Sequence, residues 1–117
     1  MGAWLLVRNG EPPAPATEVR VPESTGITVE VLNGSGRQGL ARVVTRILRA
    51  EGFDVMFFGT AREEVATSEV ILRRGDSAAV RRVAEAVGIS RVRIGLDTLL
   101  RIDVTVLLGA DYRPDPD

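Results

Sequence analysis

Alternating apolar and polar residues mark strands near both ends of a central stretch of the chain. Ile27, Val29 and Val31 alternate with Thr28 and Glu30, and later Ile102, Val104, Val106 and Leu108 alternate with Asp103 and Thr105. A period of two residues is typical of a strand that buries one face. Shorter patterns predict further strands within residues 53–58, 70–72 and 92–94.

Two other segments have the period of an amphipathic helix. One buried stripe consists of Leu40, Val43, Val44, Ile47 and Leu48, and the other of Val80, Val83, Ala84 and Val87. Gly52 and Gly88 are the expected helix ends, and Asp76 is a good N-cap for the second helix. The predicted order is therefore β-α-β-β-α-(β)-β, with a polar loop at 59–68.

The polar positions of the first and last strands separate two kinds of α/β fold. Thr28, Glu30, Asp103 and Thr105 fall on one face, which is therefore expected to be open to water. A dinucleotide-binding fold instead covers both faces of a parallel sheet with helices. We therefore predict an α+β fold in two layers, a β-α-β-β-α-β ferredoxin-like sandwich with two helices on one face of a four- to five-stranded mixed sheet.

The second strand is rich in large apolar residues. Phe53, Val55 and Phe57 alternate with Asp54, Met56 and Phe58, and core packing is the preferred explanation for the three phenylalanines. Met56 and Phe58 fit a one-sided strand less well, which would be explained if part of the second sheet face were covered.

Proline separates a folded unit from its two flanking segments. Residues 9–26 hold four of the six prolines and are typical of an extended spacer, and residues 113–117 cannot continue a strand. We place the domain at 27–112. The apolar piece "AWLLV" at 3–7 is far shorter than the ~20 residues that span a bilayer. Residues 1–26 are either the end of a membrane anchor with its linker or an ordinary chain start.

Composition removes several classes of chemistry. The chain has 117 residues, a net charge of −1, no cysteine and no histidine, and all fifteen basic residues are arginine. Disulfides, thiolate nucleophiles and the commonest general base and metal ligand are thus excluded. The near-neutral charge gives no overall attraction to nucleic acid. We predict no enzymatic activity, no metal, no cofactor and no nucleic-acid partner.

A glycine motif follows the first predicted strand. Gly34, Gly36 and Gly39 form G-x-G-x-x-G, which is found in dinucleotide-binding turns. However, Asn33 lengthens this turn, and the acidic residue expected after the second strand is missing. A structural turn with Ser35 as helix N-cap is the stronger interpretation. Free amides at a helix start can still receive an anion. Candidate ligand-binding residues are therefore Asn33, Gly34, Ser35, Gly36 and Arg37.

The first predicted helix also carries a row of arginines. Arg42, Arg46 and Arg49 share its outward face and form a candidate basic contact face for an acidic polymer. A solvated helix surface is the alternative interpretation.

Three short motifs are shared with a known family. They are "VLNGSG-x-x-GLA", "L-x-x-x-GF-x-V" and "DVTVLLG-x-D", in that order. Together they make residues 27–112 resemble the C-terminal domain of the LytR-CpsA-Psr family. Asn33, Gly34, Ser35, Gly36 and Gly39 correspond to the glycine-rich turn of that family. No catalytic residue is carried over, because the family's catalytic domain has no counterpart in this sequence.

The resemblance implies a bacterial extracytoplasmic domain, on the periplasmic or cell-wall side, of a parent protein held by one N-terminal membrane anchor. The expected function is that of a non-catalytic cell-envelope module that binds a cell-wall glycopolymer or an envelope protein. The alternative is a small anion-binding or phosphate-binding domain that uses the glycine-rich turn. A dimerisation domain that pairs through an exposed strand edge is a third possibility, and the oligomeric state is left open.

Overall fold

The computed structural model describes residues 21–114, so the expected anchor remnant, most of the spacer and the last three residues lie outside the described part. The elements are β1 (Thr28–Asn33), α1 (Leu40–Ala50), β2 (Asp54–Thr60), β3 (Glu69–Leu72), α2 (Ser77–Val87), β4 (Val92–Ile94) and β5 (Val104–Leu108). Neither helix in 21–114 is long and apolar enough to cross a bilayer.

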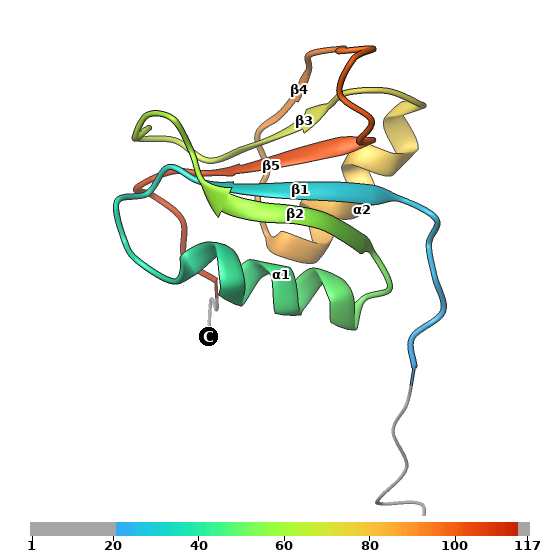
Figure 1. Cartoon of the computed structure of the whole chain (residues 1–117), viewed down its shortest axis with the longest axis horizontal. Coiled ribbons are helices and arrows are strands. Elements are labelled where there is room, and N and C mark those ends of the chain that lie inside the picture. The colour runs from blue at the N-terminus through green and yellow to red at the C-terminus, as the bar shows by residue number, and fades with distance from the viewer. Residues whose placement is uncertain (1–20, 115–117) are drawn as a thin grey trace, which may run out of the picture.

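The predicted two-layer α+β architecture is confirmed. Both helices pack on one face of a five-stranded mixed sheet with strand order β2-β1-β5-β3-β4 (Figure 1). β1 is parallel to β2 and to β5, whereas β3 is parallel to β4 and antiparallel to β5. In this sheet the two strands of each β-α-β unit are neighbours, whereas in a ferredoxin-like sheet another strand lies between them. The last strand, β5, joins the two units at the centre.

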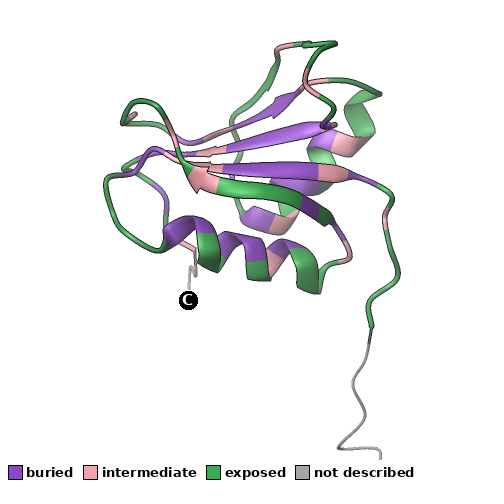
Figure 2. Ribbon diagram, in the orientation of Figure 1, coloured by how far each residue is buried: buried purple, intermediate pink, exposed green. Residues whose placement is uncertain are grey.

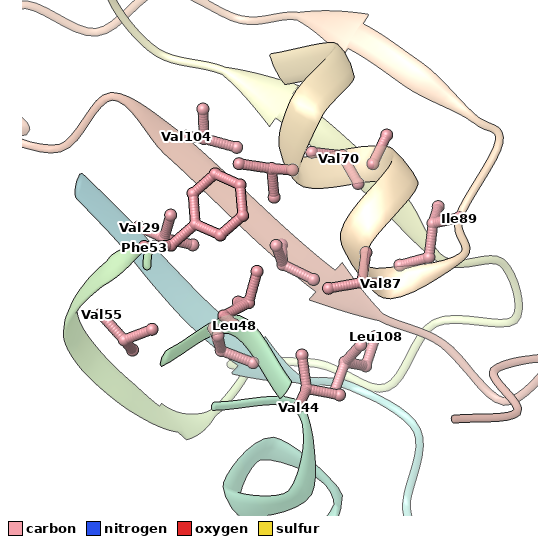
Figure 3. Packing of buried hydrophobic residues seen from close by; sticks show 14 of the residues in the cluster. Val29, Val44, Leu48, Phe53, Val55, Val70, Val87, Ile89, Val104 and Leu108 are labelled. Carbon is pink, nitrogen blue, oxygen red and sulfur yellow. The ribbon is translucent and has the colours of Figure 1, made fainter. Parts of the chain in front are cut away.

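The core lies between the helices and the sheet. Figure 3 shows side chains of α1 and α2 meeting those of β1, β3 and β5 there. Fully buried members include Val29, Val106, Val44, Leu48 and Val83. Burying one such side chain contributes about 1.5–3 kcal/mol, so this layer carries most of the stability.

The helix-free face of the sheet is polar, but its centre is not open to water. The prediction is wrong for Glu30 and Thr105, which are 9% and 0% exposed. Thr105 Oγ1 donates a hydrogen bond to Glu30 Oε2 at 2.7 Å and accepts one from Arg73 Nε at 3.0 Å. Arg73 also donates to the carbonyl of Gly95. This network satisfies polar groups that would otherwise be costly to bury.

A β-bulge in β2 changes which phenylalanines are buried. The register shifts at Met56, so that Glu30 pairs with Phe57 on the helix-free face. One extra residue sends the following side chains to the opposite faces. Met56 and Phe57 are 58% and 53% exposed, Phe58 is also exposed, and only Phe53 is in the core. Figure 2 shows β2 as the most exposed of the long strands. The prediction of core packing for all three phenylalanines is therefore wrong.

Helix α2 begins and ends where the sequence predicts. Asp76 has an extended backbone, and its side chain accepts a hydrogen bond from the Ala78 amide at 3.1 Å. Gly88 ends the helix in the left-handed conformation with φ +76°, which glycine adopts without steric cost.

Candidate functional site

The glycine-rich turn is organised by the side chain of Asn33. Its Oδ1 accepts hydrogen bonds from the Ser35 amide at 3.0 Å and from Ser35 Oγ at 2.6 Å, and its Nδ2 donates to the Arg37 carbonyl at 2.8 Å. Ser35 Oγ in turn accepts from the Arg37 amide. These are Asx-type and Ser-type turns. The prediction of Ser35 as helix N-cap is wrong, because α1 begins after Gly39, which has φ +85°.

Two features of the turn oppose its use by an anion. The guanidinium of Arg37 donates to the carbonyls of Tyr112 at 2.6 Å and Ala110 at 3.3 Å. The Glu64 carboxylate lies against Gly36, since a Cβ at Gly36 would be 3.1 Å from both of its oxygens. A phosphate beside the turn would be repelled by this carboxylate. The anion site at Asn33–Arg37 stays a prediction.

The C-terminal residues 109–112, here called the clamp, join the turn to the rest of the fold. Asp111 Oδ1 accepts hydrogen bonds from the Ser68 amide at 2.9 Å and from Ser68 Oγ at 2.7 Å. The Gly109 amide donates to the same Ser68 hydroxyl, and the Tyr112 hydroxyl donates to the Val87 carbonyl at 2.8 Å. The clamp therefore ties together the glycine-rich turn, the β2–β3 loop and α2.

The residues that carry the family motifs thus have structural roles. The Gly34 amide donates to the Leu108 carbonyl at 2.8 Å, which joins the first motif to the last. At the other end of β5, Asp103 accepts a hydrogen bond from the Thr28 amide and forms an ion pair with Arg74 at 2.8 Å. These motifs therefore hold the fold together.

Asp103 and Asp111 both have lowered pKa values. Hydrogen bonds from Ser68 hold the pKa of Asp111 below its ordinary value of 3.8, against an opposing effect of burial. Burial raises the pKa of Asp103, but hydrogen bonds from Thr28 and Arg74 outweigh it, so the net shift is downward. A carboxyl whose pKa is lower in the folded state stabilises the fold above the unfolded-state pKa.

Acid is therefore expected to weaken the domain as the pH falls through and below about 4. In the variant Asp111→Asn the charge is gone, while an oxygen remains to accept from Ser68. Its free energy of unfolding should depend less steeply on pH between about pH 5 and 3 than that of the wild type. Urea unfolding at a series of pH values measures both slopes. Equal slopes would contradict the role given to Asp111.

The predicted arginine row lies on the exposed side of α1, beside the edge strand β2. Arg42, Arg46 and Arg49 are exposed. The guanidinium of Arg42 lies 5.9 Å from the centre of the Phe58 ring, within cation–π range. Arg49 Nη2 donates to the Val55 carbonyl at 3.0 Å. We call these three arginines together with Phe58 the α1–β2 surface, because Phe57 lies on the opposite, helix-free face of the sheet.

The charges of this surface are not neutralised within the described chain. The two ion pairs found in residues 21–114 are Arg74–Asp103 and Arg93–Glu69. No carboxylate is therefore paired with the arginines of α1 there. The arginine row was predicted from the sequence, but its neighbour Phe58 was not. The signal was the run Met56-Phe57-Phe58, in which three consecutive large apolar residues break the strand alternation.

The fold and this surface define a two-layer α+β domain with an open basic and aromatic surface at one sheet edge. Residues 26–112 match the family model described as "LytR cell envelope-related transcriptional attenuator". The chain belongs to this family, which confirms the predicted resemblance. The family description associates the domain with the cell envelope.

One solved structure with a related arrangement is the solution structure of the C-terminal domain of RV0431. It is 24% identical in sequence, with a TM-score of 0.48, and the alignment covers 92% of this chain and 88% of that one. No curated protein matches the chain.

Proposed function

We propose that this domain is a non-catalytic interaction module of the cell envelope that binds an acidic cell-wall glycopolymer through the α1–β2 surface. The observation that carries the proposal is the row of three arginines without carboxylate partners beside the exposed ring of Phe58. Guanidinium groups bind carboxylates and phosphates through paired hydrogen bonds. The ring of Phe58 offers flat apolar area to the apolar face of a sugar ring.

The shape of the surface suits a polymer better than a small molecule. α1 is eleven residues long, and Arg42, Arg46 and Arg49 follow one another at about one helical turn of ~5.4 Å. Charges repeated along an extended chain can therefore contact several arginines at once. The extracytoplasmic location and the membrane anchor of the parent protein belong to this proposal.

An envelope protein is the other partner class that the family resemblance suggests. The uncompensated like charges favour the polymer, because a protein partner would have to supply a matching acidic surface, whereas an acidic polymer carries such charges throughout. The small-anion alternative at the glycine-rich turn is opposed by Glu64 and by the engagement of Arg37.

Removing two of the arginines should weaken polymer binding. The double variant Arg42→Ala/Arg46→Ala is expected to bind purified acidic wall polysaccharide at least about tenfold more weakly than the wild type. Arg49 is left in place because it also contacts β2. Binding should fall with added salt, because the contacts are between exposed charges. Amide-resolved NMR titration measures affinity and location together.

The matched control is Arg91→Ala/Arg101→Ala, which removes the same charge from two exposed arginines that precede and follow β4, at the opposite edge of the sheet. It should bind like the wild type, and a neutral polysaccharide should bind neither protein. If both double variants lost affinity for the polysaccharide equally, the overall charge of the domain and not the α1–β2 surface would be responsible. Shifts confined to 33–39 would favour the glycine-rich turn instead.

A further inference from the structure

The second edge of the sheet, β4, exposes a row of aliphatic side chains. Val92, Ile94 and Leu96 are 40%, 65% and 66% exposed. Val92 pairs with Val70 and Ile94 with Leu72, whose side chains are buried on the helix side. Val92 and Ile94 therefore lie on the helix side of the sheet, at a position that α2 does not cover, and Leu96 follows them in the next loop. Figure 1 shows β4 at the opposite edge from β2.

A groove of about 430 Å³ runs between α2 and β4. Its lining includes Arg81, Ala84, Glu85, Gly88 and Val92. Arg81 and Glu85 are one helical turn apart and carry opposite charges. Ala84 and Gly88 are small, so a neighbouring element can approach the helix closely here.

The outer backbone groups of β4 are free to pair. The Gly95 amide donates to the Leu72 carbonyl, and the Arg91 carbonyl accepts from the Val70 amide. In a parallel ladder these alternate residues face the neighbouring strand. The amide and carbonyl groups of Val92 and Ile94 therefore point away from the sheet. Such an edge is a template for another strand.

We propose that a second copy of this chain occupies this edge, through antiparallel pairing of β4 with the partner's β4. Val92 lies opposite the partner's Ile94, which gives four backbone hydrogen bonds and one continuous ten-stranded sheet. The two-fold axis passes beside Arg93. Ile94 of each copy lies against Val92 at the groove of the other, and the α2 helices lie antiparallel with Arg81 facing the partner's Glu85.

The charges of Arg81 and Glu85 favour a second copy of this chain as the partner at the β4 edge. A two-fold interface uses the same patch twice, so the patch must be self-complementary. Arg81 and Glu85 meet this requirement, because each faces its opposite in the partner. The two Arg93 side chains can lie near the axis, because each forms an ion pair with its own Glu69 at 3.0 Å.

The β2 edge does not have this property. A two-fold pair there would bring two rows of uncompensated arginines from α1 close together. This inference is independent of the proposed polymer binding, since the two surfaces lie on opposite edges of the sheet.

Sedimentation equilibrium of the full 117-residue chain tests the proposal. From low micromolar to millimolar concentration, the mass should rise from 12.6 kDa toward twice that value. The variant Ile94→Arg places two charges at the centre of the interface and should remain monomeric. Met56→Arg, an equivalent change on the β2 edge, should dimerise like the wild type.

Charge exchange across the interface gives a second test. Arg81→Glu and Glu85→Arg each convert two attractive pairs into repulsive ones, so each should raise the dimer Kd about tenfold. The double variant Arg81→Glu/Glu85→Arg restores opposite charges and should recover the wild-type Kd. Circular dichroism shows whether each variant is folded. If Ile94→Arg does not fold, the charge-exchange variants alone test the interface.

Several results would overturn the inference. A wild-type chain that stays monomeric up to millimolar concentration has no such interface. A dimer that survives Ile94→Arg but dissociates with Met56→Arg pairs through β2. If the charge-exchanged double variant remained as weak as the single ones, Arg81 and Glu85 would not face each other.

Discussion

Replacing Gly109 by alanine is expected to lower the free energy of unfolding by about 3 kcal/mol. A Cβ at this position would lie 2.5 Å from the carbonyl carbon of Thr67 and 2.8 Å from its amide nitrogen and its carbonyl oxygen. These are backbone atoms, so no rotation of a side chain relieves the overlap. The neighbouring Ser68 is held by Asp111 and by the Gly109 amide. The clamp would therefore have to separate from the β2–β3 loop.

A matched glycine separates this clash from the general effect of removing a glycine. Gly75 has φ +85°, and a Cβ there would meet no atom within 4 Å. Gly75→Ala should cost about 1 kcal/mol, from backbone strain alone. Urea unfolding followed by circular dichroism gives both values. Equal losses in the two variants would show that the contact with Thr67 is not the reason for glycine at 109.

The helices and strands were predictable from the sequence because their signals are local. The stripe of α2 repeats within eleven residues, and its two ends are set by Asp76 and Gly88. The alternation in β1 and β5 likewise indicates strands without knowledge of their neighbours. The two-layer architecture follows from this information, since the sheet has apolar residues on one face and polar residues on the other.

The errors concern features that depend on distant parts of the chain. Glu30 is buried because Thr105 of β5 and Arg73, directly after β3, lie beside it. The sequence around Glu30 alone does not predict these contacts. The bulge at Met56 is set by pairing with β1, and it exposes Phe57. The strand order, with β5 between the two β-α-β units, is also a product of long-range pairing.

The candidate site likewise has features that were predictable from the local sequence and features that depend on distant residues. The arginine row on α1 was predicted, because three residues at helical spacing need no tertiary information. Its aromatic neighbour Phe58 was not, because the bulge in β2 places that ring on the helix side of the sheet. The glycine motif suggested a ligand, yet Arg37 and Asn33 contact groups of the same chain. We therefore interpret the glycine-rich turn as a motif that the family shares because the fold requires it.

That interpretation makes Asn33 a stability residue. Asn33→Ala removes the acceptor for two Ser35 groups and the donor to the Arg37 carbonyl. Because Ser35 is buried, its amide and hydroxyl would lose partners that water cannot fully replace. We expect the free energy of unfolding to fall by about 2 kcal/mol. Gln38→Ala, a change at an exposed neighbour in the same turn, should cost less than about 0.5 kcal/mol.

Inorganic pyrophosphate separates the structural role of the turn from a binding role. A ligand that binds the folded state raises the thermal midpoint of unfolding. Because Glu64 lies against Gly36 and Arg37 is held by the clamp, pyrophosphate should leave the wild-type midpoint unchanged. A rise in the wild type that disappears in Arg37→Ala would instead establish an anion site. The glycines would then serve a ligand as well as the fold, and the polymer proposal would become the secondary one.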